Sequence, residues 1–235
     1  MDGTQRLSVA RLGVVDYAAA LELQEAMVAA RVCDAIGDTL MLLEHPHVFT
    51  LGRGADERYL VDPRAGVPVY RVSRGGQVTY HGPGQLVGYP ILKLEGAERD
   101  VIRYLRRLEH AITGALARFG IEGSCRQGLT GVWVGTEKIA SIGVGLRRWV
   151  TLHGFALNVT TDLSFFDAII PCGIEGCRMT SIAALGQAGV TVTDFADALE
   201  LEFAATFGYG GVAAAAAQTL WNLVDSAAAG CEARR

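Results

Sequence analysis

The chain has 235 residues and a mass of 25.0 kDa, which suits one large domain or two small ones. Half of the residues are hydrophobic and 20% are charged, so the composition excludes wholesale disorder. The 21 basic residues do not outnumber the 25 acidic ones, and the formal net charge is -4. Because a nucleic-acid surface needs an excess of Lys and Arg, we expect no nucleic-acid partner.

The sequence also argues against membranes, secretion and bound metal. No apolar stretch approaches the roughly 18 residues of a membrane span, and the first residues lack the pattern of a signal peptide. We therefore expect a cytoplasmic protein without membrane association. The cysteines are odd in number and scattered, which is not typical of a disulfide framework. They are Cys33, Cys125, Cys172, Cys177 and Cys231. No second pair accompanies the C-x4-C spacing of Cys172 and Cys177, so we expect no metal and no cofactor.

The first half of the chain predicts a strand, a helix and several further strands. The strand covers Leu7 to Val14, and the helix runs from Tyr17 to about Ile36, since Asp16 is a suitable N-cap and Gly37 a suitable end. Three extended runs separated by turn residues then predict strands. These runs are Thr39 to Glu44, Val48 to Leu51 and Val67 to Val72.

The second half predicts two more long helices and a meander of strands. Apolar residues at a spacing of three and four predict a helix from about Glu98 to Phe119. Gly131 to Val159 interleaves β-branched and aromatic residues with Gly, which predicts three antiparallel strands. In its middle strand, Lys138, Ala140 and Ile142 should share one face. A further helix is expected from Thr193 to about Phe207.

The mixed order of strands and helices predicts an α+β fold. We expect a single domain with a central mixed, largely antiparallel sheet flanked by helices. The domain is assigned to residues 1–210. Residues 211–235 form an Ala-rich C-terminal extension, which we expect to add at most a short helix and to be peripheral or partly disordered.

The densest chemical signal is the segment RGGQVTYHGPGQ, from Arg74 to Gln85. Gly75 and Gly76 allow a backbone to approach a ligand closely, and Tyr80 and His81 supply polar tips. A tight hairpin turn explains the same residues equally well. The segment matches neither the P-loop nor the dinucleotide fingerprint, so its residues alone leave both explanations open.

Two further side chains could carry chemistry, each with an ordinary alternative. Cys172, in the segment Pro171-Cys172-Gly173-Ile174, becomes a nucleophile if a nearby cation favours its thiolate, but most cytosolic thiols are inert. Lys138 lies among apolar and small residues, where loss of water would suit it to exchange protons, but it could equally snorkel from a strand end.

A basic stripe is predicted opposite the apolar face of the second long helix. A solvated surface is the simplest explanation for it, and docking of an acidic protein is the alternative. The stripe consists of Arg99, Arg103, Arg106, Arg107 and His110.

Five segments, taken together and in order, resemble the lipoyl(octanoyl) transferase family, octanoyl-[acyl-carrier-protein]:protein N-octanoyltransferase. The resemblance covers about residues 10 to 205. It implies a fold similar to the catalytic domain of biotin and lipoate protein ligases. The segments are Glu44 to Gly54, Arg74 to Gln85, Gly131 to Gly143, His153 to Val159 and Pro171 to Ile174.

The resemblance implies an acyltransferase of lipoate biosynthesis. It would move an octanoyl group from octanoyl-acyl carrier protein to a lysine of lipoyl domains of 2-oxoacid dehydrogenase complexes and of the glycine cleavage carrier protein. Cys172 would carry the acyl group as a thioester, and Lys138 would favour the thiolate and act as the acid/base. The implied substrate-binding residues are Arg74, Gly75, Gly76, Gln77, Val78, Thr79, Tyr80, His81, Ser141, Ile142, Gly143, Gly154, Phe155 and Ala156.

Two other functions stay open at this point. An ATP-dependent lipoate or biotin ligase on the same fold would activate a free acid as an adenylate and would need no cysteine. A non-catalytic module that binds an acyl-carrier protein would need neither Cys172 nor Lys138. A thioester donor already holds the energy for amide formation, so the transferase reading predicts no use of ATP.

Overall fold

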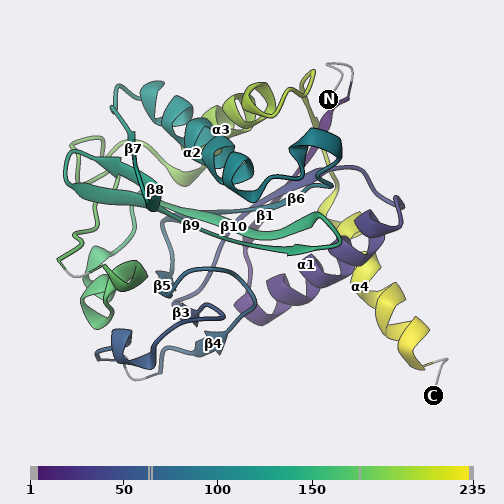
Figure 1. Cartoon of the computed structure of the whole chain (residues 1–235), viewed down its shortest axis with the longest axis horizontal. Helices are drawn as coiled ribbons and strands as arrows, with labels where there is room; N and C mark the ends of the chain where they lie inside the picture. Colours follow the sequence, from purple (N-terminus) through teal and green to yellow (C-terminus); the bar gives the residue numbers. More distant parts are fainter. Residues whose placement is uncertain (1–4, 63, 65, 175, 233–235) are drawn as a thin grey trace.

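A large mixed sheet forms the centre of the protein (Figure 1). It is seen in a computed structural model that describes residues 5–62, 64, 66–174 and 176–232. Within these residues, the large sheet has eight strands. In spatial order they are β11 (Val212–Ala214), β1 (Leu7–Val14), β2 (Thr39–Glu44), β6 (Gln85–Ile91), β10 (Val150–Asn158), β9 (Glu137–Arg147), β8 (Leu129–Val134) and β7 (Ser124–Arg126).

A small second sheet and four helices surround the large sheet in the described part of the chain. The small sheet has the order β4 (Val69–Arg71), β3 (Val48–Leu51) and β5 (Val78–His81). The helices are α1 (Tyr17–Val32), α2 (Val101–Ala117), α3 (Val192–Thr206) and α4 (Ala217–Glu232). Short 3-10 turns cover Glu57–Tyr59, Gly96–Glu98, Leu163–Ala168 and Pro171–Gly173.

The helices cover both faces of the large sheet. Figure 1 shows α2 and α3 on one face, and α1 with α4 and the small sheet on the other. Leu108 and Phe203 belong to the core on the first face, and Leu23 and Met27 to the core on the second. Because both faces are covered, every residue of β6 and β10 is buried, and these two strands run through the middle of the molecule.

The pairing of the strands confirms the predicted α+β fold with a mixed, largely antiparallel sheet. Among the described strands of the large sheet, only β1 pairs in parallel, with β2 on one side and β11 on the other. The expected meander is confirmed as β8, β9 and β10, which pair antiparallel in sequence order.

The long helices lie where they are predicted, with shifted ends. α1 ends at Val32 rather than near Ile36, because the chain turns at Cys33 and takes a left-handed conformation at Asp34. α2 begins at Val101 rather than Glu98, since the Asp100 side chain caps it and Gly96–Glu98 forms a separate turn. In the run from Val67 to Val72, only β4 is a strand.

The C-terminal segment joins the large sheet. Leu7 of β1 lies opposite Val212 of β11, so the segment after residue 210 supplies an edge strand. α4 is longer than the short helix expected; it lies beside α1 and buries Leu220. The division of the chain at residue 210 stays a prediction, and residues 233–235 lie outside those described.

The predicted basic stripe on α2 is partly neutralised within the chain. Arg107 and Arg103 pair with Glu98, and Arg106 pairs with Glu109. Across the described helices, none combines the length and the apolar character needed to cross a membrane.

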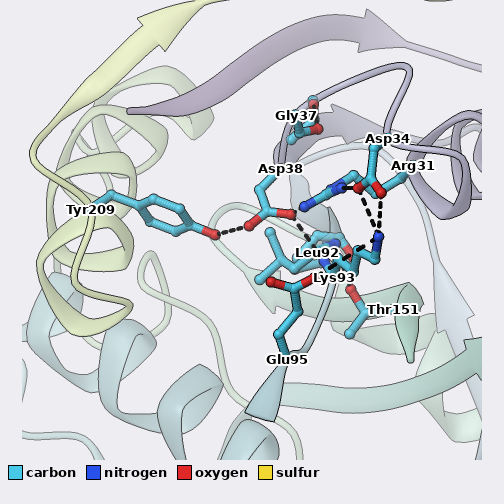
Figure 2. A network of polar contacts seen from close by, with 11 residues as sticks. Arg31, Asp34, Gly37, Asp38, Leu92, Lys93, Glu95, Thr151 and Tyr209 are labelled. Atoms are coloured by element: carbon cyan, nitrogen blue, oxygen red, sulfur yellow. Dashed lines mark hydrogen bonds and ion pairs between the residues drawn. The ribbon is translucent and has the colours of Figure 1, made fainter. Parts of the chain in front are cut away.

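One end of the fold is held by a polar cluster that we name the Asp38 network (Figure 2). It consists of Arg31, Asp34, Asp38, Lys93 and Tyr209. The buried Asp38 carboxylate accepts hydrogen bonds from Arg31 Nε, the Lys93 backbone N–H and Tyr209 Oη at 2.8 to 2.9 Å. Lys93 Nζ also pairs with Asp34. The network therefore ties the end of α1 to the chain following β6 and α3.

Candidate active site

Cys172 lies in the single 3-10 turn Pro171–Gly173, where the backbone bends sharply. Its φ of 57° and ψ of 15° place it in the left-handed region, which is unfavourable for a residue with a Cβ. The turn leaves the side chain half-buried at the wall of a pocket. A strained backbone that presents a thiol to a pocket is typical of a functional position.

The Lys138 ammonium lies directly against this thiol. Lys138 Nζ is 3.0 Å from Cys172 Sγ and 3.0 Å from the Thr130 carbonyl oxygen, and the side chain has no exposed surface. The Trp133 ring centroid lies 4.9 Å from the same nitrogen. The side chain does not snorkel. A cation at this distance from a sulfur stabilises the thiolate over the thiol.

A β-bulge explains how Lys138 reaches the thiol. The register between β8 and β9 shifts so that Val132 lies opposite Ala140 while Trp133 lies opposite Lys138. The extra residue in β9 changes the face of the sheet to which the side chains before it point. As a result, both Lys138 Nζ and Ser141 Oγ lie within 4.0 Å of Cys172 Sγ. The expectation that Lys138, Ala140 and Ile142 share one face is therefore wrong. Ala140 and Ile142 pack in the core.

The pocket beside Cys172 gathers most of the residues expected to bind substrate. Its free volume is about 40 Å³, so it is a narrow pocket. Its wall contains Arg74, Gly76, Gln77, Val78, Thr79, His81, Ser141, Ile142, Gly143, Gly154, Phe155 and Ala156. Gly75 and Tyr80 are not part of the wall. Tyr80 stacks on Phe165, and its hydroxyl bonds to His47 Nδ1.

Arg74 organises the loop that forms one side of the pocket. Its guanidinium donates to the backbone carbonyls of Thr50, Gly75 and Gln77 at 2.7 to 2.9 Å. Its Nε has no partner among the described residues. Burial lowers the pKa of Arg74, in line with the cost of holding a cation away from water. A buried, unused donor at a pocket wall suits a polar group of a ligand.

Two buried histidines at the pocket stay neutral. Burial lowers the pKa of His81 to about 3 and that of His153 to about 4. Gln85 Nε2 donates to Asn158 Oδ1, so Gln85 Oε1 accepts at 2.8 Å from His81 Nδ1. This arrangement assigns the proton of His81 to Nδ1 and leaves Nε2 as an acceptor.

The sequence did not identify Tyr17, Tyr89 and His153 as parts of this pocket, although all three line it. Burial raises the pKa of Tyr17 to about 12. The one available signal was the position of His153 next to Gly154, in a segment that the resemblance already singled out. The described residues include no group of three His, Cys, Asp or Glu side chains that could hold a metal ion.

The fold and the site together place a cysteine beside a buried lysine at the wall of a pocket next to the sheet. The chain belongs to the lipoyl protein ligase A/B catalytic domain family, whose pattern matches residues 16–204. It is 56% identical to a protein of Solibacter usitatus named octanoyltransferase, over 75% of this chain and 82% of that protein. These relationships confirm the predicted family and make the chain an acyltransferase.

Solved structures confirm the predicted fold. Lipoate-protein ligase A bound with ATP superimposes with a TM-score of 0.72 at 17% identity, covering 95% of this chain and 93% of that chain. The biotin protein ligase of Aquifex aeolicus without ligand gives a TM-score of 0.50 at 13% identity, covering 86% of this chain and 69% of that chain. At these identities the likeness concerns the fold alone.

Proposed function

We propose that the protein transfers an octanoyl group from octanoyl-acyl carrier protein to a lysine of lipoyl-carrier domains, through a thioester on Cys172. The observation that carries this proposal is the 3.0 Å contact between Lys138 Nζ and Cys172 Sγ at the pocket wall. Relatives such as the octanoyltransferase of Solibacter usitatus support the acyl group chosen.

The reaction has two transfers. In the first, the Cys172 thiolate attacks the carbonyl carbon of the donor thioester; a new S–C bond forms, the donor S–C bond breaks, and the donor thiolate leaves with a proton from the Lys138 ammonium, which becomes neutral. In the second, the acceptor amine attacks the Cys172 thioester, the N–C bond forms and the S–C bond breaks. The amine must lose a proton in this step, and Lys138 is placed to exchange it.

The wall of the pocket suits an acyl chain next to the thiol. Val78, Ile142, Phe155 and Ala156 offer apolar surface, while Gly143 lies close to Gly75 and Gly154 close to the neighbouring strand β6. A Cβ at Gly154 would lie 2.1 Å from the Gly88 carbonyl oxygen, so only glycine fits there. Backbone N–H groups near the thiol would stabilise the oxyanion that forms in each transfer.

The proposed donor and acceptors follow from the same reading. Octanoyl-acyl carrier protein supplies the thioester, and the lipoyl domains of 2-oxoacid dehydrogenase complexes and the glycine cleavage carrier protein supply the lysine. A cytoplasmic location is part of this proposal. No metal or nucleotide takes part in the two transfers as written.

An ATP-dependent ligase is the competing function, since the fold is shared with lipoate-protein ligase A. Adenylate formation requires no thiol, and it gives no role to the contact between Cys172 and Lys138. A non-catalytic binding module also gives that contact no role. Acylation of Cys172 therefore separates the proposal from both alternatives.

The test is a single-turnover reaction followed by intact-mass measurement. Mixing the protein with octanoyl-acyl carrier protein, without ATP and with chelator, should add one octanoyl group. The adduct should be absent in Cys172→Ala and present in the matched variant Cys177→Ser. Adding a lipoyl domain should move the group to the acceptor lysine. A strict requirement for ATP with free octanoate would favour the ligase instead.

A further inference from the structure

One peptide group links helix α2 to the lysine of the site. The carbonyl oxygen of Thr130 accepts a hydrogen bond from Lys138 Nζ at 3.0 Å. The N–H of the same peptide group, on Gly131, donates to Glu109 Oε1 at 3.0 Å. The orientation of this single rigid plane therefore sets where the lysine finds its acceptor.

Glu109 is a charged side chain in an apolar place. It has no exposed surface, and its neighbours on α2, Leu108 and Ile112, belong to the core. Burying a carboxylate costs free energy unless each oxygen is bonded. One oxygen accepts from Gly131, and the other pairs with Arg106, whose side chain is 38% exposed. The acyl transfer as proposed above gives Glu109 no role.

Gly131 allows the backbone to touch the lysine. Its φ is 132°, and a Cβ there would lie 2.5 Å from Lys138 Cε and 2.6 Å from the Ala140 carbonyl oxygen. The ammonium thus lies between the Thr130 carbonyl on one side and Cys172 Sγ on the other. Any rotation of the peptide group would move the acceptor away from the ammonium.

The charges from Glu109 through the Thr130–Gly131 peptide group to Lys138 reinforce one another. A carboxylate accepting from the N–H end of a peptide group makes its carbonyl oxygen a stronger acceptor, and the effect is largest where water is excluded. The carbonyl in turn favours Lys138 as an ammonium pointing toward the sulfur. We propose that Glu109 is a positioning residue for Lys138, acting through the Thr130–Gly131 peptide group to stabilise the ammonium–thiolate pair. This inference rests on the role proposed for Lys138.

In the described structure, few titratable groups lie near Glu109 and Lys138. Arg106 on α2 and Cys125 on β7 face Glu109, and burial, followed by the Glu109 charge, raises the pKa of Cys125. Cys172 and Cys177 face Lys138, and the charges of Arg74 and Arg126 act on Cys172 and Cys177, respectively. Removal of Glu109 should therefore change the pH dependence of Cys172 alkylation. Cys177 serves as a second thiol for comparison.

The experiment compares Glu109→Ala, Glu109→Gln and the matched control Glu202→Gln. Glu202 also pairs with an arginine, Arg118, which caps the C-terminal end of α2. We expect Glu109→Ala to slow iodoacetamide alkylation of Cys172 about tenfold at neutral pH and to move its pH profile upward, because an unpaired buried N–H lets the peptide rotate. In octanoyl transfer, kcat should fall by a similar factor with KM unchanged.

Glu109→Gln keeps an acceptor for the Gly131 N–H, so it should recover most of the alkylation rate, and Glu202→Gln should match the unchanged protein. Peptide-resolved mass spectrometry reads Cys172 and Cys177 separately, and urea unfolding checks that each variant is folded. A folded Glu109→Ala variant with unchanged alkylation and kcat would overturn the inference, as would equal losses in Glu109→Ala and Glu202→Gln. If the unchanged protein transfers no octanoyl group, the proposed function fails, while the alkylation profiles still test the role of Glu109.

Discussion

The Asp38 network and the pocket beside Cys172 are both buried and polar, and they use their hydrogen bonds differently. Every oxygen of the Asp38 carboxylate is bonded, and the network joins three segments of the fold (Figure 2). At the pocket, Arg74 Nε and His153 Nδ1 are buried and have no partner in the described part of the chain, and Cys172 is held in a left-handed backbone. The fully bonded Asp38 carboxylate stabilises the fold, and Arg74 Nε at the pocket stays available to a ligand.

Removing Lys138 should give the largest effect on the pocket side of this comparison. Lys138→Ala should reduce octanoyl transfer at least roughly a hundredfold, because both the thiolate partner and the proton carrier are lost. Lys138→Arg keeps the charge, so part of the Cys172 alkylation should remain while transfer to the amine fails. The pH profile of alkylation, measured beside the transfer rate in folded protein, checks both. Unchanged profiles in Lys138→Ala would leave the lysine a structural role only.

Asp38→Asn should act on stability and leave catalysis intact. The amide has one oxygen for three donors and removes the charge that faces Arg31, so we expect a loss of about 3 kcal/mol in the free energy of unfolding. Urea unfolding measures it. In the exposed pair of Arg11 and Asp197, the matched change Asp197→Asn should cost less than about 1 kcal/mol. A lower transfer rate in folded Asp38→Asn would show that the Asp38 network also affects catalysis.

The buried histidines should make stability depend on pH. Burial lowers the pKa of His45 to about 4, as it does for His153, while an unfolded histidine titrates near 6.5. Between these values the unfolded chain binds the proton and the folded chain does not, so stability falls as the pH falls. Each such histidine should lower the free energy of unfolding by about 1 kcal/mol between pH 6.5 and 5.5. This decrease should stop once the pH is below the pKa of the folded histidine.

His153→Asn tests this dependence, since asparagine tolerates the left-handed backbone at that position. The variant should remove about 1 kcal/mol of the change between pH 6.5 and 5.5 in urea unfolding. The control is His110→Gln, on the exposed side of α2, which should leave the slope as it was. An identical slope in His153→Asn would show that the pKa of His153 is the same in the folded and unfolded protein.

Ser141→Ala should give the smallest effect. The hydroxyl lies 4.0 Å from Cys172 Sγ, at the limit of a hydrogen bond to sulfur, so its removal should slow transfer less than about threefold. Steady-state rates beside those of the Lys138 variants provide the measurement. A loss as large as that of Lys138→Ala would mean that the hydroxyl moves closer to the sulfur during the reaction.

The sequence predicted the elements whose signals are local. The apolar spacing of α2 and the cap at Asp16 placed two helices, and the alternation after Gly131 placed the meander. The ends of helices were less certain, because Asp100 and Gly96–Glu98 compete to begin α2. Pairing between distant segments, such as β1 with β11, leaves no periodic signal in an Ala-rich stretch.

The sequence likewise pointed to some residues of the site and missed others. Resemblance to a family selected Cys172 and Lys138 and the segments that gather at the pocket, but residue patterns alone left each with an ordinary explanation. Strict alternation missed the bulge that turns Lys138 toward the thiol. The sequence does not indicate a role for Glu109, because an acidic residue near Arg106 on a helix is typical of a solvated surface. Its contact with Gly131 in the structure shows otherwise.

The parallel pairing of β1 with β11 has a consequence for synthesis. A nascent chain that has reached residue 210 has made β2 and can pair it with β1, but the outer edge of β1 still exposes its N–H and C=O groups. Contacts between residues 7 and 212 close one of the longest loops that the chain can make, and such contacts form slowly. During that interval the bare edge is available to other strands, so the edge of β1 stays an aggregation hazard until the end of translation.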